Sequence, residues 1–95
     1  MLVKIVARIP EKLRGLKVTR GKLLLWDSSR SSFAKSIKQL DGEEVEVEFE
    51  VPDQKLSYIT DGERFDILLG VDEKRENCTI RRWATARPIS VKILG

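Results

Sequence analysis

From Glu44 to Val51 the chain alternates acidic and apolar residues without a break. Successive side chains of a β-strand point to opposite faces, so this pattern predicts a strand with one face on a core and the other lined by carboxylates. The apolar face would carry Val45, Val47, Phe49 and Val51, and the acidic face Glu44, Glu46, Glu48 and Glu50. Because four like charges in a row repel one another, we expect cationic neighbours beside this strand.

Length and composition favour one globular domain spanning residues 1–95, with 41% apolar and 35% charged residues. No run of about 18 apolar residues occurs, so no membrane-spanning helix is expected. Lys4 and Arg8 interrupt the N-terminal stretch too early for a signal-peptide core, which predicts a cytoplasmic protein. The single cysteine, Cys78, excludes an internal disulfide and fits a reducing compartment.

The charged residues are segregated along the chain. Residues 1–40 carry a balance of +8, residues 41–66 of −8 and residues 67–95 of +3. This asymmetry fits either pairing of basic strands with the acidic one or two surfaces of opposite sign. Many Lys, Arg and Glu with few Asn and Gln also predict a thermophilic host, or a virus or mobile element of one.

Several further segments have the alternation or turn residues of β-strands. Hairpins are predicted at Arg20-Gly21, with an irregular extended segment as the alternative, and at Asp61-Gly62, between segments 56–60 and 63–69. Asp72 to Asn77 is an unbroken polar run that predicts a loop. Additional strands are expected over residues 2–9, 78–86 and 89–94.

One helix is predicted, over about residues 29–40. Phe33, Ile37 and Leu40 follow at i, i+4 and i+7, after a capping sequence Asp27-Ser28-Ser29 and before Gly42. The fold class is therefore α+β: a mostly antiparallel curved sheet or partly open barrel of six to eight short strands, with one helix on a face or an end. An all-β barrel is the alternative.

The residues offer little for catalysis, and we expect no enzyme, cofactor or metal site. The chain has no histidine, no glycine-rich phosphate loop and no second thiol beside Cys78. Pro52-Asp53 with Asp72-Glu73-Lys74 matches the spacing of a nuclease metal site, but the polar run predicts a solvent loop where that site needs a strand. We therefore interpret the match as chance.

Nucleic-acid binding is the favoured function. Arg81, Arg82, Trp83 and Arg87 combine cations with a large aromatic ring on one predicted strand, and the predicted helix carries a second basic set: Arg30, Lys35 and Lys38. An exposed tryptophan can stack on a base while arginines hold phosphates, so single-stranded DNA or RNA is the expected partner. The alternative is that Trp83 is core and that Arg81 and Arg82 pair with the glutamate row.

The glutamate row supports a different class of function. Its carboxylates recur every ~6.8 Å along the strand, close to the spacing of backbone phosphates, so it could imitate a nucleic acid and occupy a basic site on a protein. The competing interpretation is a cross-strand ion ladder with Lys4 and Arg8, or with Arg82. The alternative function is thus a protein–protein interaction module or inhibitor that uses Glu44–Glu50 or a sheet edge.

Overall fold

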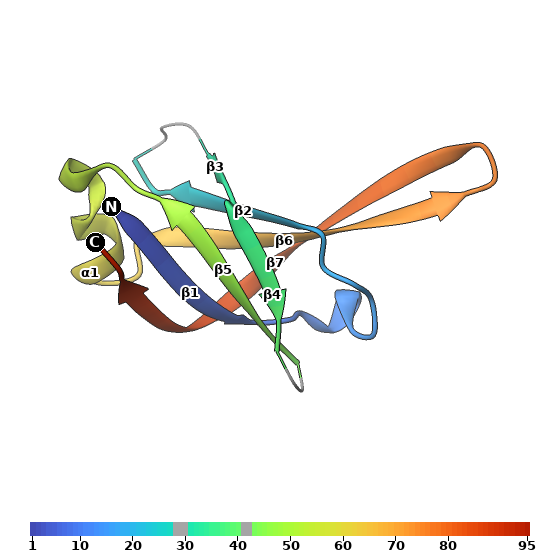
Figure 1. Ribbon diagram of the computed structural model, residues 1–95, viewed down its shortest axis with the longest axis horizontal. Coiled ribbons are helices and arrows are strands. Elements are labelled where there is room, and N and C mark those ends of the chain that lie inside the picture. The colour runs from blue at the N-terminus through green and yellow to red at the C-terminus, as the bar shows by residue number, and fades with distance from the viewer. Residues whose placement is uncertain (28–30, 41–42) are drawn as a thin grey trace.

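A computed structural model describes residues 1–27, 31–40 and 43–95 (Figure 1). Its elements in chain order are β1 (Leu2–Arg8), a 3₁₀ turn η1 (Glu11–Leu13), β2 (Arg20–Leu25), β3 (Ser32–Phe33), β4 (Ser36–Gln39), β5 (Glu44–Glu50), a 3₁₀ turn η2 (Asp53–Lys55), α1 (Ser57–Thr60), β6 (Phe65–Arg75) and β7 (Cys78–Ile93). The fold is the predicted small α+β domain in which an antiparallel sheet dominates. Within the described ranges no helix is long and apolar enough to cross a membrane.

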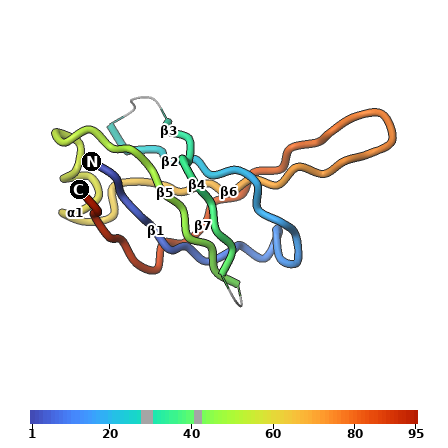
Figure 2. The backbone as a smooth tube through the Cα atoms, viewed as in Figure 1, coloured from blue at the N-terminus to red at the C-terminus, as the bar shows by residue number. Residues whose placement is uncertain are grey.

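The seven strands form one curled sheet in the order β3-β2-β6-β7-β1-β5-β4, with every pair antiparallel. The short passage 32–39 brings the two ends of this sheet together, because β3 pairs with β2 and β4 pairs with β5. Between them the amide of Ala34 donates to the carbonyl of Gly21, and the amide of Lys35 donates to that of Glu48. The sheet therefore curls into a half-barrel (Figures 1 and 2).

The concave inner face holds the hydrophobic core. Val45, Val47 and Phe49 of β5 are fully buried, as the alternation predicted, and so are Ile5 of β1 and Ile67 of β6. Gly21 of β2 is required at the point where the passage 32–39 crosses: a Cβ atom there would lie 2.9 Å from Cγ1 of Val47 and 3.1 Å from Cβ of Ala34.

The glutamate row lies on the outer face beside cations, as the ion-ladder interpretation predicted. Lys4 of β1 is paired in register with Glu48, and its Nζ lies 3.7 Å from a carboxylate oxygen of Glu46 and of Glu48. Arg8 stands opposite Glu44 and reaches Glu43 at 3.9 Å. The cations of this ion ladder therefore come from β1.

The predicted helix over residues 29–40 is wrong for the residues that the structure describes; positions 29 and 30, the caps at Ser28 and Ser29, and Gly42 lie outside them. Residues 32–33 and 36–39 are strands, and the helix of the fold is α1. The segment is rich in serine, a residue that is unfavourable in helix interiors because its hydroxyl group competes for backbone hydrogen bonds. Its backbone instead finds partners on two strands, β2 and β5, that are distant in sequence. Phe33, expected in the core, is 63% exposed.

The two predicted hairpins are also wrong. Gly62 has the expected positive φ, +114°, but residues 57–60 form α1, so the turn joins a helix to β6. Gly21 lies within β2, and Arg20 begins it. In both places a glycine that matched a hairpin turn has a different role: a helix-to-strand turn at Gly62 and a close packing contact at Gly21.

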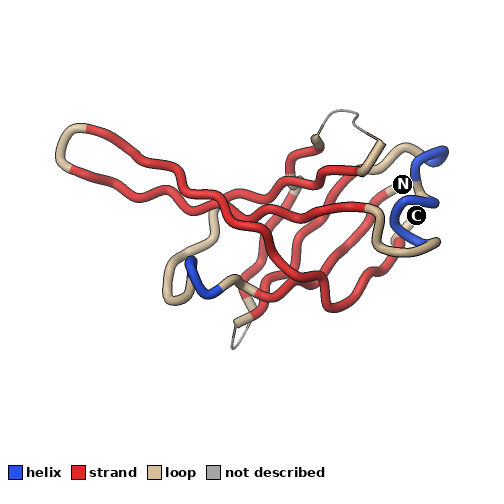
Figure 3. Tube along the Cα trace, turned by 180° about the vertical axis from the view of Figure 1, so that it is seen from behind, coloured by secondary structure: helices blue, strands red, loops and turns tan. Residues whose placement is uncertain are grey.

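The polar run from Asp72 to Asn77, predicted as a loop, belongs mostly to β6. That strand continues to Arg75, pairs with Cys78 of β7 and turns at residues 76–77. The resulting two-stranded arm extends away from the body of the sheet (Figures 1 and 3). Here cross-strand hydrogen bonds and ion pairs offset the absence of a buried face; Arg81 of β7, for example, donates to Asp72 of β6.

Candidate nucleic-acid interface

An aromatic and basic surface covers the outer face of strands β3, β2, β6 and β7, at the base of the arm. The register places Lys22 of β2 opposite Phe33 of β3 on one side and Leu68 of β6 on the other. Two residues further along β6, on the same face, Gly70 stands opposite both Arg20 of β2 and Trp83 of β7. We call Lys22, Phe33 and Trp83, together with Arg20 and Arg81, the aromatic face.

Lys22 lies between two aromatic rings. Its Nζ atom is 4.5 Å from the centroid of the Trp83 ring and 5.6 Å from that of Phe33, within cation–π range of both. Among the described residues Lys22 has no carboxylate partner. Strands β2 and β3, with β7 from a distant part of the sequence, thus bring a cation and two rings together on one open sheet surface.

The ring of Trp83 lies across Gly70, where there is no side chain. A Cβ atom at position 70 would lie 3.1 Å from Cε3 and Cζ3 of the indole and 2.9 Å from Cβ of Arg20. Trp83 is half-buried for this reason, and it is absent from the core cluster. The sequence alternative that placed Trp83 in the core is therefore wrong.

Asp72 holds two arginines at the same end of the face. Nε of Arg81 donates to one carboxylate oxygen at 2.9 Å, and Nε of Arg20 lies 3.7 Å from the other. Asp72 thus accepts a hydrogen bond from Arg81 and forms a longer ion pair with Arg20, so one carboxylate lies between the two guanidinium groups. The hydrogen bond from Arg81 lowers the pKa of Asp72, so this carboxylate is ionised at neutral pH.

Trp26 extends the aromatic surface along β2. Trp26 directly follows the last residue of β2 and is an even number of residues from Lys22, so its side chain is on the same face. It is 59% exposed, and its indole N–H donates to Asp66 of β6 at 3.2 Å. At a strand rise of ~3.4 Å per residue, Trp26 lies about 14 Å from Lys22. It is a second aromatic site on the same face.

The other predicted site residues are distributed over the molecule. Arg82 points to the opposite face from Arg81 and lies 3.9 Å from Glu73. Arg87 is exposed and stands in register with Arg8 of β1, where β7 joins the body of the sheet. Lys38 is on β4 opposite Glu46. Arg30 lies outside the described residues. The structure brings Arg81 and Trp83 together on one face of β7, whereas Arg82 is on the opposite face and Lys35 and Lys38 lie beside glutamates of β5.

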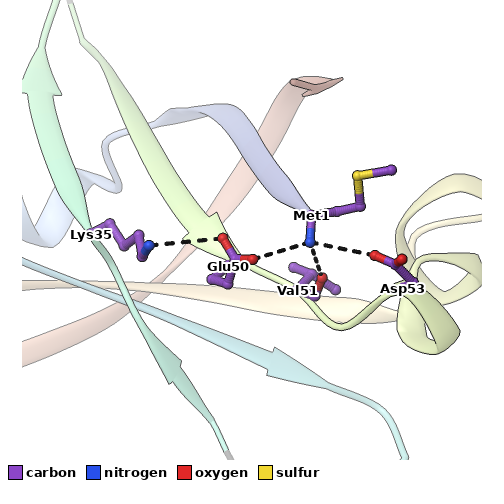
Figure 4. A network of polar contacts seen from close by, with 5 residues as sticks. All are labelled: Met1, Lys35, Glu50, Val51 and Asp53. Atoms are coloured by element: carbon purple, nitrogen blue, oxygen red, sulfur yellow. Dashed lines mark hydrogen bonds and ion pairs between the residues drawn. The ribbon is translucent and has the colours of Figure 1, made fainter. Parts of the chain in front are cut away.

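Lys35 belongs to a separate polar network at the end of the glutamate row (Figure 4). Its Nζ lies 3.8 Å from Glu50, which also accepts a 3.1 Å hydrogen bond from the amino group of Met1. That amino group further contacts the carbonyl of Val51 and the carboxylate of Asp53. The hydrogen bond to Glu50 raises the pKa of the Met1 amino group. Lys35 therefore helps to neutralise the acidic strand.

Sequence reasoning missed Arg20, Lys22, Trp26 and Phe33. The available signal was weak: Lys22 and Trp26 share the parity of one strand face, but Phe33 matched a helical stripe. Only the pairing of β2 with β3 and β6 shows that Phe33 and Trp83 flank the same lysine.

The acids of the nuclease-like pattern do not meet. Asp53 is in η2, beside the amino group of Met1, whereas Asp72 is on β6 at the base of the arm, opposite Arg81 of β7. Across the described ranges no group of three or more histidine, cysteine or acidic side chains is arranged to hold a metal ion.

Comparison with known proteins gives no assignment: no family model, curated protein or solved structure matches this chain.

Proposed function

We propose that the chain is a non-catalytic module that binds single-stranded nucleic acid on the aromatic face. The observation that carries this proposal is the position of Lys22 between Phe33 and Trp83 on an open sheet surface. Bases stack on solvent-accessible aromatic rings, and Phe33 is exposed and Trp83 half-buried on this surface. Cations beside the rings neutralise phosphates.

The charge arrangement supports a backbone-binding role for the arginines. Asp72 orients Arg81 through a 2.9 Å hydrogen bond and attracts Arg20 across a 3.7 Å ion pair, so both guanidinium groups are gathered at one point of the face before a phosphate arrives. A held side chain loses less conformational entropy on binding than a mobile one. The arginine side chains are 47% and 45% exposed, which leaves their outer edges accessible to solvent and ligand.

The test is a salt-titrated binding assay with labelled single- and double-stranded DNA and RNA of equal length. We expect single strands to bind more tightly than duplexes, with affinity falling as salt rises, because phosphate neutralisation releases counterions. Comparison of the DNA and RNA probes shows which of the two nucleic acids the chain prefers. Absence of binding to every probe at low salt would refute the proposal.

Two variants separate stacking from phosphate contact. Trp83→Ala should weaken single-strand binding by about 1–3 kcal/mol, the contribution of one stacked base. Arg81→Ala should weaken binding to every sequence and reduce the slope of affinity against salt by about one phosphate. Lys92→Ala is the charge-matched control, since Lys92 is an exposed residue of β7 in register with Lys4 of β1, away from the aromatic face.

The alternative of a protein contact through Glu44–Glu50 has less support. Lys4 lies between Glu46 and Glu48, and Lys35 pairs with Glu50, so the row is partly neutralised within the chain. Under that alternative Trp83→Ala and Arg81→Ala would have no effect on partner binding, and Glu48→Lys would abolish it.

A cytoplasmic location in a thermophilic host, or in a mobile element of one, is also proposed. It rests on the composition and on Cys78, an exposed thiol without a disulfide partner.

A further inference from the structure

A notch opens beside Trp83, between η1 and β7. It is lined by Pro10, Glu11, Lys12, Trp83, Ala84 and Thr85, and its volume is about 510 Å³, within the range of small-ligand sites. The notch exists because β1 ends at Arg8 and the chain then turns away through η1. It adjoins the aromatic face through Trp83, which lines the notch and also lies under Lys22.

One wall of the notch is an open strand edge. β7 pairs with β1 only from Arg87 onward, and in the described strands residues 78–86 pair with β6 alone. The backbone of Trp83, Ala84 and Thr85 therefore borders the notch along the edge where no further strand is added. An edge of this kind offers backbone N–H and C=O groups to a polar ligand.

The other wall carries two side chains of opposite charge. Glu11 and Lys12 are exposed, and neither has an ion-pair partner among the residues that the structure describes. A carboxylate accepts hydrogen bonds from an exocyclic amino group, such as N4 of cytosine, and an ammonium group binds a phosphate. Thymine and uracil present a carbonyl oxygen where cytosine presents its amino group, and a carboxylate repels it.

We propose that the notch holds one nucleobase of the bound strand and that Glu11 selects a base with an exocyclic amino group. The base would lie beside the indole of Trp83, its amino group would donate to Glu11, and Lys12 would contact the adjoining phosphate. This inference rests on the proposed function, since it assigns base preference to one position of that interface.

The test compares fluorescein-labelled oligodeoxycytidine and oligothymidine of 15 nucleotides, at one salt concentration, with the full chain. Both probes are pyrimidine strands of equal charge, so their difference isolates the base. We expect the cytosine probe to bind at least about fivefold more tightly, the lower end of discrimination by a specific side-chain contact. Glu11→Gln should remove this preference, because the amide accepts from cytosine and donates to thymine.

Glu63→Gln is the matched control. Glu63 is an exposed acid between α1 and β6, remote from η1, and its substitution removes the same charge. It should leave the preference unchanged. Equal binding of the two probes by the native chain, or a preference that persists in Glu11→Gln, would overturn the base-selecting notch while leaving the single-strand interface intact. Failure of both probes to bind would overturn the proposed function itself.

Discussion

The indole of Trp83 packs directly against Gly70 of the neighbouring strand, so closely that a side chain there would force the ring to shift. Its Cε3 and Cζ3 atoms would be 3.1 Å from a Cβ atom at position 70. The ring position that defines the aromatic face is therefore set by the absence of a methyl group on β6 as much as by Trp83 itself.

Gly70→Ala should displace this ring while the sheet remains folded. The added Cβ atom meets the edge of the indole and Cβ of Arg20, and the movable group is the indole. In a Trp26→Phe background, where Trp83 is the remaining tryptophan, we expect a red shift of the emission maximum and a loss of single-strand affinity comparable to Trp83→Ala. Unchanged emission would show that the ring stays in place.

Two phenylalanines provide a matched test of the core. Phe49 is fully buried and Phe33 is 63% exposed. Phe49→Ala should lower the free energy of unfolding by about 3–5 kcal/mol, whereas Phe33→Ala should change it by no more than about 0.5 kcal/mol. Denaturant unfolding of both variants measures the difference. Similar losses for the two would contradict the assignment of Phe33 to the outer face.

The contact between Gly21 and Val47 gives a test of how the sheet is closed. Gly21→Ala places a methyl group 2.9 Å from Cγ1 of Val47 and should destabilise the fold by about 1–3 kcal/mol, as overpacking does. Val47→Ala removes the clashing atom, so the double variant should be more stable than the sum of the two single losses predicts. Strict additivity in a double-mutant cycle would indicate that the passage 32–39 does not pack on Gly21.

Alternation of apolar and polar residues predicted the body of the sheet well. Within a half-buried strand this alternation depends only on the strand's own residues, and it identifies the face that packs on the core. Val47 and Phe49 on β5 and Ile5 on β1 are buried as their alternation required. The row of glutamates on β5 likewise predicted cationic neighbours, and Lys4 is one of them, in ion pairs with Glu46 and Glu48.

The passage 32–39 could not be predicted in this way. Phe33 and Ile37 have the spacing of a helical stripe, yet they lie on opposite faces of the sheet: Phe33 beside Lys22 and Ile37 against the core. The chain changes partner strand at Ala34 and Lys35, so long-range hydrogen bonds to Gly21 and Glu48 decide its conformation. The aromatic face was missed for the same reason, since Phe33 reaches it only through that pairing.

The ion pair between Arg81 and Asp72 predicts a dependence of stability on pH. Arg81 lowers the pKa of Asp72 in the folded protein below the value of an unpaired carboxyl. The folded state then binds fewer protons than the unfolded state, so the pair stabilises the fold at pH values above the unfolded pKa of about 3.9. That contribution is lost as the pH falls through the lower folded pKa.

The free energy of unfolding should be compared between the native chain and Asp72→Asn as a function of pH. The difference between the two should be constant near neutral pH and shrink below about pH 4. Glu76→Gln, at the exposed turn of the arm, is the control for loss of a carboxylate from the arm and is measured beside Asp72→Asn at each pH. A difference for Asp72→Asn that stays constant down to pH 2 would show that Arg81 does not hold this carboxylate in solution.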